Sequence, residues 1–280
     1  AEALARVALA GDRLLVTLLD PVADGLNAPA FHERLTAWIA SASTLLSKAD
    51  GTAPAGATLL PDHVRYLCGV HPYGAADYTD EVHAQVEAAL DDPRCVGIGE
   101  IGLDYHFDYD DDVAPAPHGL QIEVMERQLD LAVRRDVPVE LHIRNDVGDE
   151  SRAAHADAHR VLCETGIPQA GCILHCFTED RATMERFVDL GCRIAFGGAA
   201  TFRRNEGIRE AFAACPLDRI LFETDCPYMA PEPLRGLECE PAMIAFTVDA
   251  LCRDRAARTG EDPRLIARVA WDNAVRLFDR

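Results

Sequence analysis

Residues 171–196 read GCILHCFTEDRATMERFVDLGCRIAF and contain the unit from which the fold can be deduced. Gly171–His175 and Arg193–Phe196 are short apolar runs of the kind that forms buried strands. Asp180–Leu190, between them, has a helical pattern. A strand, a helix and a second strand in this order predict a βαβ unit, in which the two strands run parallel.

The same alternation continues in both directions along the chain. Seven runs are expected strands: Arg13–Leu19, Val64–Val70, Cys95–Ile98, Val137–His142, Gly171–His175, Arg193–Phe196 and Ile220–Glu223. The expected helices are Glu2–Ala10, Ala30–Ser47, Asp80–Leu90, Gly119–Arg134, His155–Thr165, Asp180–Leu190, Gly207–Ala214, Pro241–Arg255 and Pro263–Phe278. Repeated βα units predict an α/β fold with a parallel sheet, closed as a TIM-type (β/α)8 barrel.

The start of the chain departs from a complete barrel. Seven expected strands are one short of eight, and Glu2–Ala10 followed by Gly11 has the pattern of a helix end. A barrel without one strand would expose a long edge and its apolar interior. We therefore expect that a first strand, and most of its helix, are absent from this chain.

Length and composition indicate one globular domain over residues 1–280, because barrels of about 250 residues form around a single core. Hydrophobic residues make up 49% of the chain and charged residues 26%, so a large core can be buried. The ten cysteines match no structural zinc pattern and indicate free thiols in a reducing cytoplasm. We expect no membrane span, no signal peptide and a monomer. Ala49–Pro61 is expected to be a loop insertion, and Asp108–Pro117 the most mobile loop.

The net charge of −20 weighs against a protein that coats nucleic acid non-specifically. Affinity for a phosphate backbone normally comes from Lys and Arg, which displace counterions. Bound divalent cations can supply the missing positive charge locally, and carboxylates are needed to hold them. The charge also has a simpler explanation, a solvated surface with Asp-rich loops.

Four polar residues stand at the carboxyl ends of four expected strands: Glu100, His142, His175 and Asp225. In parallel barrels these ends converge on one mouth, where catalytic residues gather. Each residue alone has an ordinary structural explanation, such as a satisfied core histidine or a helix N-cap. Together they predict a metal site of mixed carboxylate and imidazole ligands.

The segments that carry these residues resemble the motifs of the TatD deoxyribonuclease family. Residues 97–105 read GIGEIGLDY, and LHIR (141–144), LHCF (174–177) and FETD (222–225) match three further family motifs. GVHP (69–72), the helix with Gln128, Phe196 before two glycines, Arg235-Gly236 before Glu240-Pro241, and Asn273 follow in the family's order. The resemblance covers nearly the whole chain, and ordered motifs are far more specific than any single tetrapeptide.

The resemblance implies a hydrolase that cleaves phosphodiester bonds of DNA with two divalent metal ions, Mg²⁺, Mn²⁺ or Zn²⁺. It implies that Glu100 bridges the metals, that His142 and His175 bind one of them, and that Asp225 is a ligand and the general base. DNA is the implied substrate, as single strands or ends, and the implied reaction is that of a 3'-5' exonuclease.

Three further residues have two interpretations each. Arg144 can clamp a phosphate oxygen, or it can form a surface salt bridge. The resemblance places His71 at the mouth of the site, in contact with substrate or with a ligand, whereas a structural histidine at a strand-to-loop corner is the alternative. Asp104 can fix the tautomer of a ligand histidine or cap the turn after Gly102.

The chain also departs from the family. The family's first strand carries a His-x-His motif that supplies two ligands of one metal, and this sequence contains no such motif. Either that segment was left out of the chain or the protein binds metal poorly. Leu237-Glu238-Cys239 replaces a usually polar run, which puts substrate contacts there in doubt. Two alternatives stay open: an amidohydrolase-like enzyme that cleaves a small-molecule or aminoacyl-tRNA ester, and a catalytically impaired barrel that binds a partner.

Overall fold

The computed structural model describes residues 1–11, 13–48, 63–106 and 115–279. Within these residues, seven strands form one parallel sheet in the order β1-β2-β3-β4-β5-β6-β7. The strands are β1 (Leu15–Leu19), β2 (Val64–Cys68), β3 (Cys95–Asp104), β4 (Val139–Arg144), β5 (Cys172–Leu174), β6 (Arg193–Phe196) and β7 (Ile220–Phe222). Every strand pairs with its neighbour in sequence, so the sheet curls in one direction into a partial barrel.

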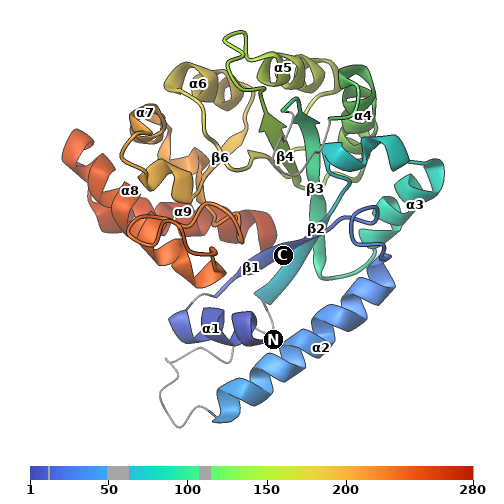
Figure 1. Ribbon diagram of the computed structural model, residues 1–280, viewed down its shortest axis with the longest axis horizontal. Coiled ribbons are helices and arrows are strands. Elements are labelled where there is room, and N and C mark those ends of the chain that lie inside the picture. Colours follow the sequence, from blue (N-terminus) through green and yellow to red (C-terminus); the bar gives the residue numbers. More distant parts are fainter. Residues whose placement is uncertain (12, 49–62, 107–114, 280) are drawn as a thin grey trace.

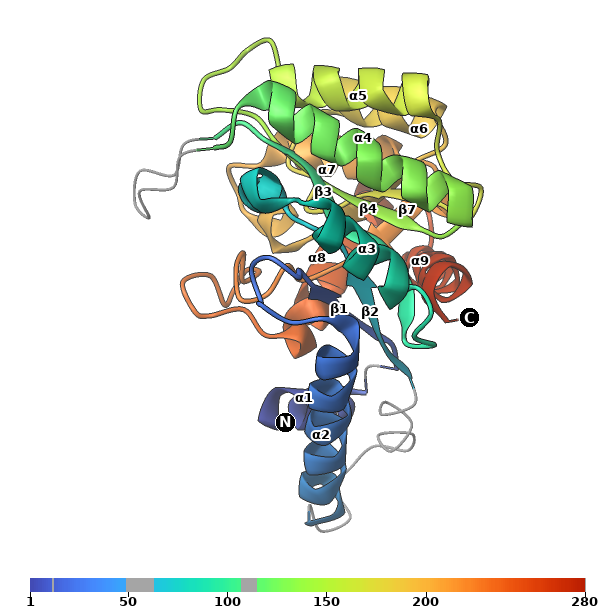
Figure 2. The same cartoon turned by 90° about the vertical axis from the view of Figure 1, so that its right-hand side faces the viewer.

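Helices cover the outer face of the sheet (Figure 1). They are α1 (Glu2–Ala10), α2 (Ala28–Lys48), α3 (Asp80–Ala89), α4 (His118–Arg135), α5 (Ala153–Thr165), α6 (Arg181–Asp189), α7 (Glu206–Ala214), α8 (Ile244–Thr259) and α9 (Pro263–Phe278). α1 and α2 pack on each other and project from one end of the body (Figure 2). Among the described residues, the search for a helix able to cross a membrane found none.

The predicted fold class is confirmed: this is the TIM-type arrangement of parallel strands and outer helices. The expected helices at Glu2–Ala10 and Pro263–Phe278 and the strand at Arg193–Phe196 have the bounds found in the structure. Pro241–Arg255 differs, because Pro241–Met243 form a 3-10 turn before α8 begins. A 3-10 helix at Pro72–Asp77 was not expected. Ala49–Pro61 and most of Asp108–Pro117 lie outside the described residues.

The largest difference concerns β3, which was expected to end at Ile98 and continues to Asp104. Glu100 therefore lies inside a strand, and the prediction that it follows the strand was wrong. The pairing of β3 with β4 shifts register between Ile98 and Ile101. A register shift of this kind re-aims side chains, and here Glu100 is one of the two residues inside it. The glycines at 97, 99 and 102 are typical of a turn in the sequence. In the structure they lie in β3, because residues 138–142 approach too closely for a side chain at these positions.

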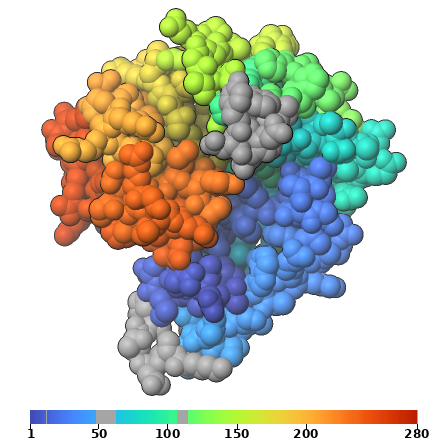
Figure 3. Space-filling view, in the orientation of Figure 1, coloured from blue at the N-terminus to red at the C-terminus, as the bar shows by residue number. Residues whose placement is uncertain are grey.

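The two ends of the sheet leave an opening. No pairing joins β1 to β7 among the described residues, and a cavity of about 800 Å³ is lined by both strands. Its walls are largely apolar, with Val16, Leu221 and Trp271 among them, while Glu100 and His175 are among its polar lining. α1 contacts the 3-10 turn before α8, and these two parts of the chain lie side by side on the face shown in Figure 3. The Arg6 Nε donates to Glu240 at 2.7 Å.

Candidate metal centre

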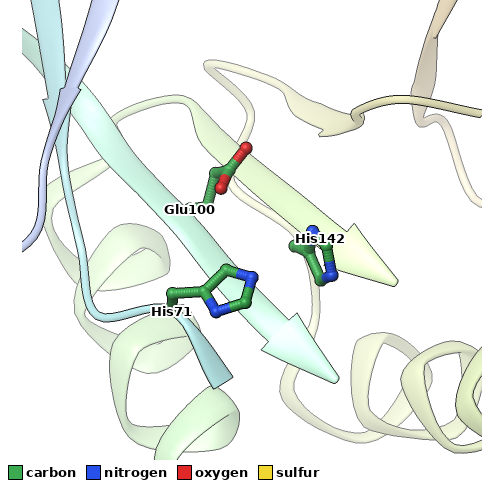
Figure 4. Close-up of side chains that lie close together, drawn as sticks. All are labelled: His71, Glu100 and His142. Carbon is green, nitrogen blue, oxygen red and sulfur yellow. The ribbon is translucent and has the colours of Figure 1, made fainter. Parts of the chain in front are cut away.

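The first group of possible metal ligands comes from three neighbouring strands. The side chains of His71, Glu100 and His142 point toward one another (Figure 4), and their ligand atoms all lie within 4.8 Å of each other. His71 follows β2, Glu100 lies in β3, and His142 lies in β4. Strands that are adjacent in a parallel sheet thus deliver one residue each to the same place, as expected for the mouth of a barrel.

A second group shares Glu100 with the first. Glu100, Glu140 and His175 also place their ligand atoms within 4.8 Å of one another. The His175 Nε2 lies 3.0 Å from Glu100 Oε1, and the Nδ1 lies 3.4 Å from Glu223 Oε2. Asp225, just after β7, lines the same cavity. The four residues expected to form the metal site therefore lie around one centre, with Glu100 in the middle.

The charges of this centre are strongly coupled. Burial alone would lower the pKa of His175, but the nearby carboxylates of Glu223 and Glu100 outweigh burial and raise it well above its usual value. Burial raises the pKa of Glu140 to about 8. Burial also raises the pKa of Asp225 to about 6; the neighbouring Glu223 adds to this effect, while His175 opposes it. A bound cation would help these crowded carboxylates to stay ionised, because it would offset their mutual repulsion.

Hydrogen bonds fix the orientation of His142. Its Nε2 lies 3.0 Å from Asp104 Oδ2, and the Asp104 side chain is 1% exposed. Burial alone would raise the pKa of Asp104, but the contacts with His142 outweigh it and hold the pKa low. An ionised Asp104 accepts a hydrogen bond from the Nε2–H of His142, which leaves the Nδ1 lone pair of His142 for a metal. The alternative, that Asp104 caps a turn after Gly102, was wrong, because β3 continues to Asp104; its Oδ1 accepts from the backbone N–H of His106 beyond the strand.

His71 and Arg144 lie beside this pair. The His71 Nδ1 accepts from the backbone N–H of Tyr73 at 3.2 Å, and the ring stands 4.4 Å from that of His142. Burial, with His142 next to it, lowers the pKa of His71 to about 3, so the ring is neutral at pH 7. Arg144 is 44% exposed, with its Nη1 3.9 Å from Asp104 Oδ2. It combines a loose ion pair with partial exposure to solvent.

Two carboxylates of the centre were not singled out from the sequence, Glu140 and Glu223. A signal for Glu140 existed, because it stands two residues before His142 and alternate residues of a strand share a face. Glu223 lies next to the expected ligand Asp225 and accepts from the backbone N–H of Cys176. Neither His106 nor His155 belongs to either ligand group. The His106 Nδ1 faces Asp146, and the His155 Nδ1 contacts the Asn145 amide at 2.8 Å.

The donor set suits a divalent cation of the borderline or hard type. Imidazole nitrogens and carboxylate oxygens favour Mn²⁺, Zn²⁺ or Mg²⁺, whereas a soft-metal site would use thiolates. Cys176, the cysteine next to His175, is held protonated, because burial and the adjacent Asp225 raise its pKa. The residues present therefore fit a metal centre of oxygen and nitrogen ligands.

Comparison with known protein families identifies the family to which this chain belongs. Residues 27–279 match the family model described as TatD related DNase. The chain belongs to the TatD family. Proteins similar to it include the uncharacterized metal-dependent hydrolase YcfH of Escherichia coli, 37% identical over 217 residues that cover 78% of this chain and 74% of YcfH. The protein named 3'-5' ssDNA/RNA exonuclease TatD of Erwinia billingiae is 30% identical over 227 residues, 79% of this chain and 80% of that protein.

Solved structures agree with the family assignment. YJJV, a TatD homologue from Escherichia coli, superposes with a TM-score of 0.74 and 27% identity, covering 100% of this chain and 91% of YJJV. A TatD-family hydrolase from Entamoeba histolytica, 16% identical, shares the fold with a TM-score of 0.67 over 99% of this chain and 88% of that one. The chain is thus a metal-dependent hydrolase of the TatD family, with two clusters of candidate metal-binding residues.

Proposed function

We propose that this TatD protein hydrolyses phosphodiester bonds of DNA, as a 3'-5' exonuclease acting on single strands or free ends. The observation that carries the proposal is Glu100, which belongs to both ligand groups and so stands where one carboxylate can bridge two cations. The similarity to a protein named as an ssDNA/RNA exonuclease supports the choice of substrate. A negatively charged chain can then bind a polyanion through its metals.

In this proposal Glu100, His142, His175 and Asp225 would hold two divalent cations, Mg²⁺, Mn²⁺ or Zn²⁺, with Glu100 as the ligand that both could share. The cations supply a water of lowered pKa and stabilise the charge that builds up on the phosphate. Asp104 holds His142 in the tautomer that presents Nδ1 to the centre. The chain's own contribution is to orient these groups before substrate arrives.

Asp225 is the proposed general base as well as a ligand. It follows β7 in a left-handed backbone conformation, with φ of 54°, which Asp tolerates better than most residues. This turn sends its carboxylate into the cavity beside Glu100. Without a cation, burial raises the pKa of Asp225 to about 6, and a bound cation would lower it, so the proposed role as a base rests on the place of Asp225 in the cavity that Glu100 also lines. Asp225 accepts the proton of the attacking water.

His71 and Arg144 are the proposed substrate contacts. The Nδ1 lone pair of His71 is already used by the backbone N–H of Tyr73, so the neutral ring carries its proton on Nε2. The Nε2–H can donate to a phosphate oxygen. Because a protonated Nε2 has no free lone pair for a metal, this tautomer favours contact with substrate over metal binding. Arg144 offers a planar fork of donors to a second phosphate oxygen from the open side of the centre.

The test is degradation of single-stranded DNA by the full-length protein with Mg²⁺ or Mn²⁺. With a label on the 5' end we expect a ladder of progressively shorter strands, and with a label on the 3' end immediate release of mononucleotide. A chelator should stop both, and added metal should restore them. Inert DNA combined with rapid hydrolysis of an aminoacyl-tRNA ester would replace the proposal with the ester hydrolase that the acidic surface favours.

The role of Asp225 has its own test. Asp225→Asn keeps the size of the side chain and removes its basicity, so we expect kcat on single-stranded DNA to fall by about 10²- to 10⁴-fold. Because the amide oxygen still offers a ligand atom, metal content should fall less than activity does. Unchanged kcat in this variant would show that Asp225 is not the base.

A further inference from the structure

Glu140 is a charged residue in an unusual place. It lies in β4, whose sequence is VELHIR, between the fully buried Val139 and Leu141. Those neighbours pack under the outer helices, so Glu140 faces the opposite way, into the barrel, on the same face as His142. Interior positions of such barrels are mostly filled by branched apolar side chains. A carboxylate there must have a compensating partner, because burying an unpaired charge is costly.

The described protein does not supply that partner. No hydrogen bond or ion pair of the Glu140 carboxylate involves any residue that the structure describes. Among the described residues, its charged neighbours are Glu100, Glu223 and Asp225, which face the imidazole of His175. Even with Glu140 protonated, the carboxylates of Glu100, Glu223 and Asp225 outnumber the one imidazole that faces them. A bound cation would balance that excess.

The geometry around Glu140 is that of a ligand. Its carboxylate lies within 4.8 Å of both Glu100 and His175, measured between possible ligand atoms. Gly99 makes room for its stem, since a Cβ on Gly99 would come within 2.8 Å of the Glu140 Cβ. Glu140 also lines the cavity between β1 and β7, together with Glu223 and Asp225. The carboxylate therefore points at open space beside the centre and not into packed side chains.

We propose that Glu140 is a direct ligand of the second cation, completing a site formed with Glu100 and His175. The inference rests on the metal centre of the proposed function and adds a ligand that the family motifs do not include.

The experiment is Mn²⁺ binding to the full-length protein and to Glu140→Gln, followed by calorimetry and electron paramagnetic resonance. We expect the wild type to bind two ions, with the spectrum of a coupled pair. In Glu140→Gln the second site should weaken by about 100-fold or more, since even residues that only orient ligands contribute about 10- to 100-fold. At Mn²⁺ concentrations that fill the first site, the spectrum should become that of a single ion.

Control variants separate ligation from other effects. Glu210→Gln removes an equal charge from an exposed position on α7 and should bind as the wild type does. Glu140→Gln should fold, because it removes repulsion among buried carboxylates. Should it fail to fold, Glu140→Asp keeps the charge, shortens the reach to the cation and should weaken the same site.

Three outcomes would overturn the inference. Equal binding by wild type and Glu140→Gln would show that Glu140 is not involved. A coupled spectrum retained at saturating Mn²⁺ would make Glu140 an electrostatic neighbour and not a ligand. A wild type that binds no metal would remove the metal centre and the proposed function with it. Normal binding of two ions with inert DNA would instead reject the substrate while leaving the role of Glu140 intact.

Discussion

Glu100→Gln is expected to lower DNA hydrolysis by at least about 10³-fold and to release bound metal. Glu100 is the one residue present in both ligand groups, so its replacement affects both cations at once. The loss of metal stabilisation is worth several kcal/mol of the barrier, and each 1.36 kcal/mol changes the rate about tenfold. The measurement pairs kcat on single-stranded DNA with metal analysis of the purified variant.

The contacts of the Glu100 side chain explain why glutamine is an informative replacement. Glutamine has the shape of glutamate but cannot offer two charged oxygens, and it leaves His175 with one carboxylate fewer at 3.0 Å. Glu123→Gln, at an exposed position on α4, removes the same charge far from any described ligand group and should keep full activity. If Glu100→Gln retained two ions and wild-type kcat, the centre would have to lie elsewhere in the molecule.

The order of strands and helices was predictable because each buried strand is a short apolar run and each helix has its own periodicity. β5 and β6 illustrate this, since nothing polar interrupts them and their expected positions agree closely with the structure. β3 could not be predicted in full. Its glycines at 97, 99 and 102 look like turn residues, and only the close approach of β4 shows why a strand needs them.

The candidate site was predictable where polar residues follow an apolar run, as at His175 and Asp225. Position along the chain was sufficient there, because carboxyl ends of parallel strands meet at one mouth. The prediction that His142 ends its strand was wrong, because β4 continues to Arg144. Glu140 escaped this reasoning because it lies within a strand, where a single charge is usually taken to face solvent. Its orientation depends on which face of β4 is inward, and that is decided by the helices packed on the other face.

The glycines of β3 lead to the second large effect. Gly102 has a φ of 145°, outside the range that other residues adopt readily, and it pairs with His142 in the sheet. A Cβ at this position would overlap the carbonyl oxygen of His142. That oxygen belongs to the backbone of a buried strand, so it cannot move aside as a flexible side chain would.

Gly102→Ala is therefore expected to lower the free energy of unfolding by about 3 kcal/mol or more, from backbone strain and overpacking together. Urea unfolding of the metal-free protein measures this loss. Gly207→Ala is the matched control. Gly207 lies in α7 with no atom within 4 Å of a Cβ added there, and alanine should be neutral or stabilising by up to about 1 kcal/mol.

The backbone that the new Cβ would displace belongs to His142, whose ring is a candidate metal ligand. Any Gly102→Ala variant that folds should therefore also bind metal more weakly. A variant with wild-type stability and wild-type metal binding would mean that β3 and β4 can separate here without loss, and that the glycine does not set their distance.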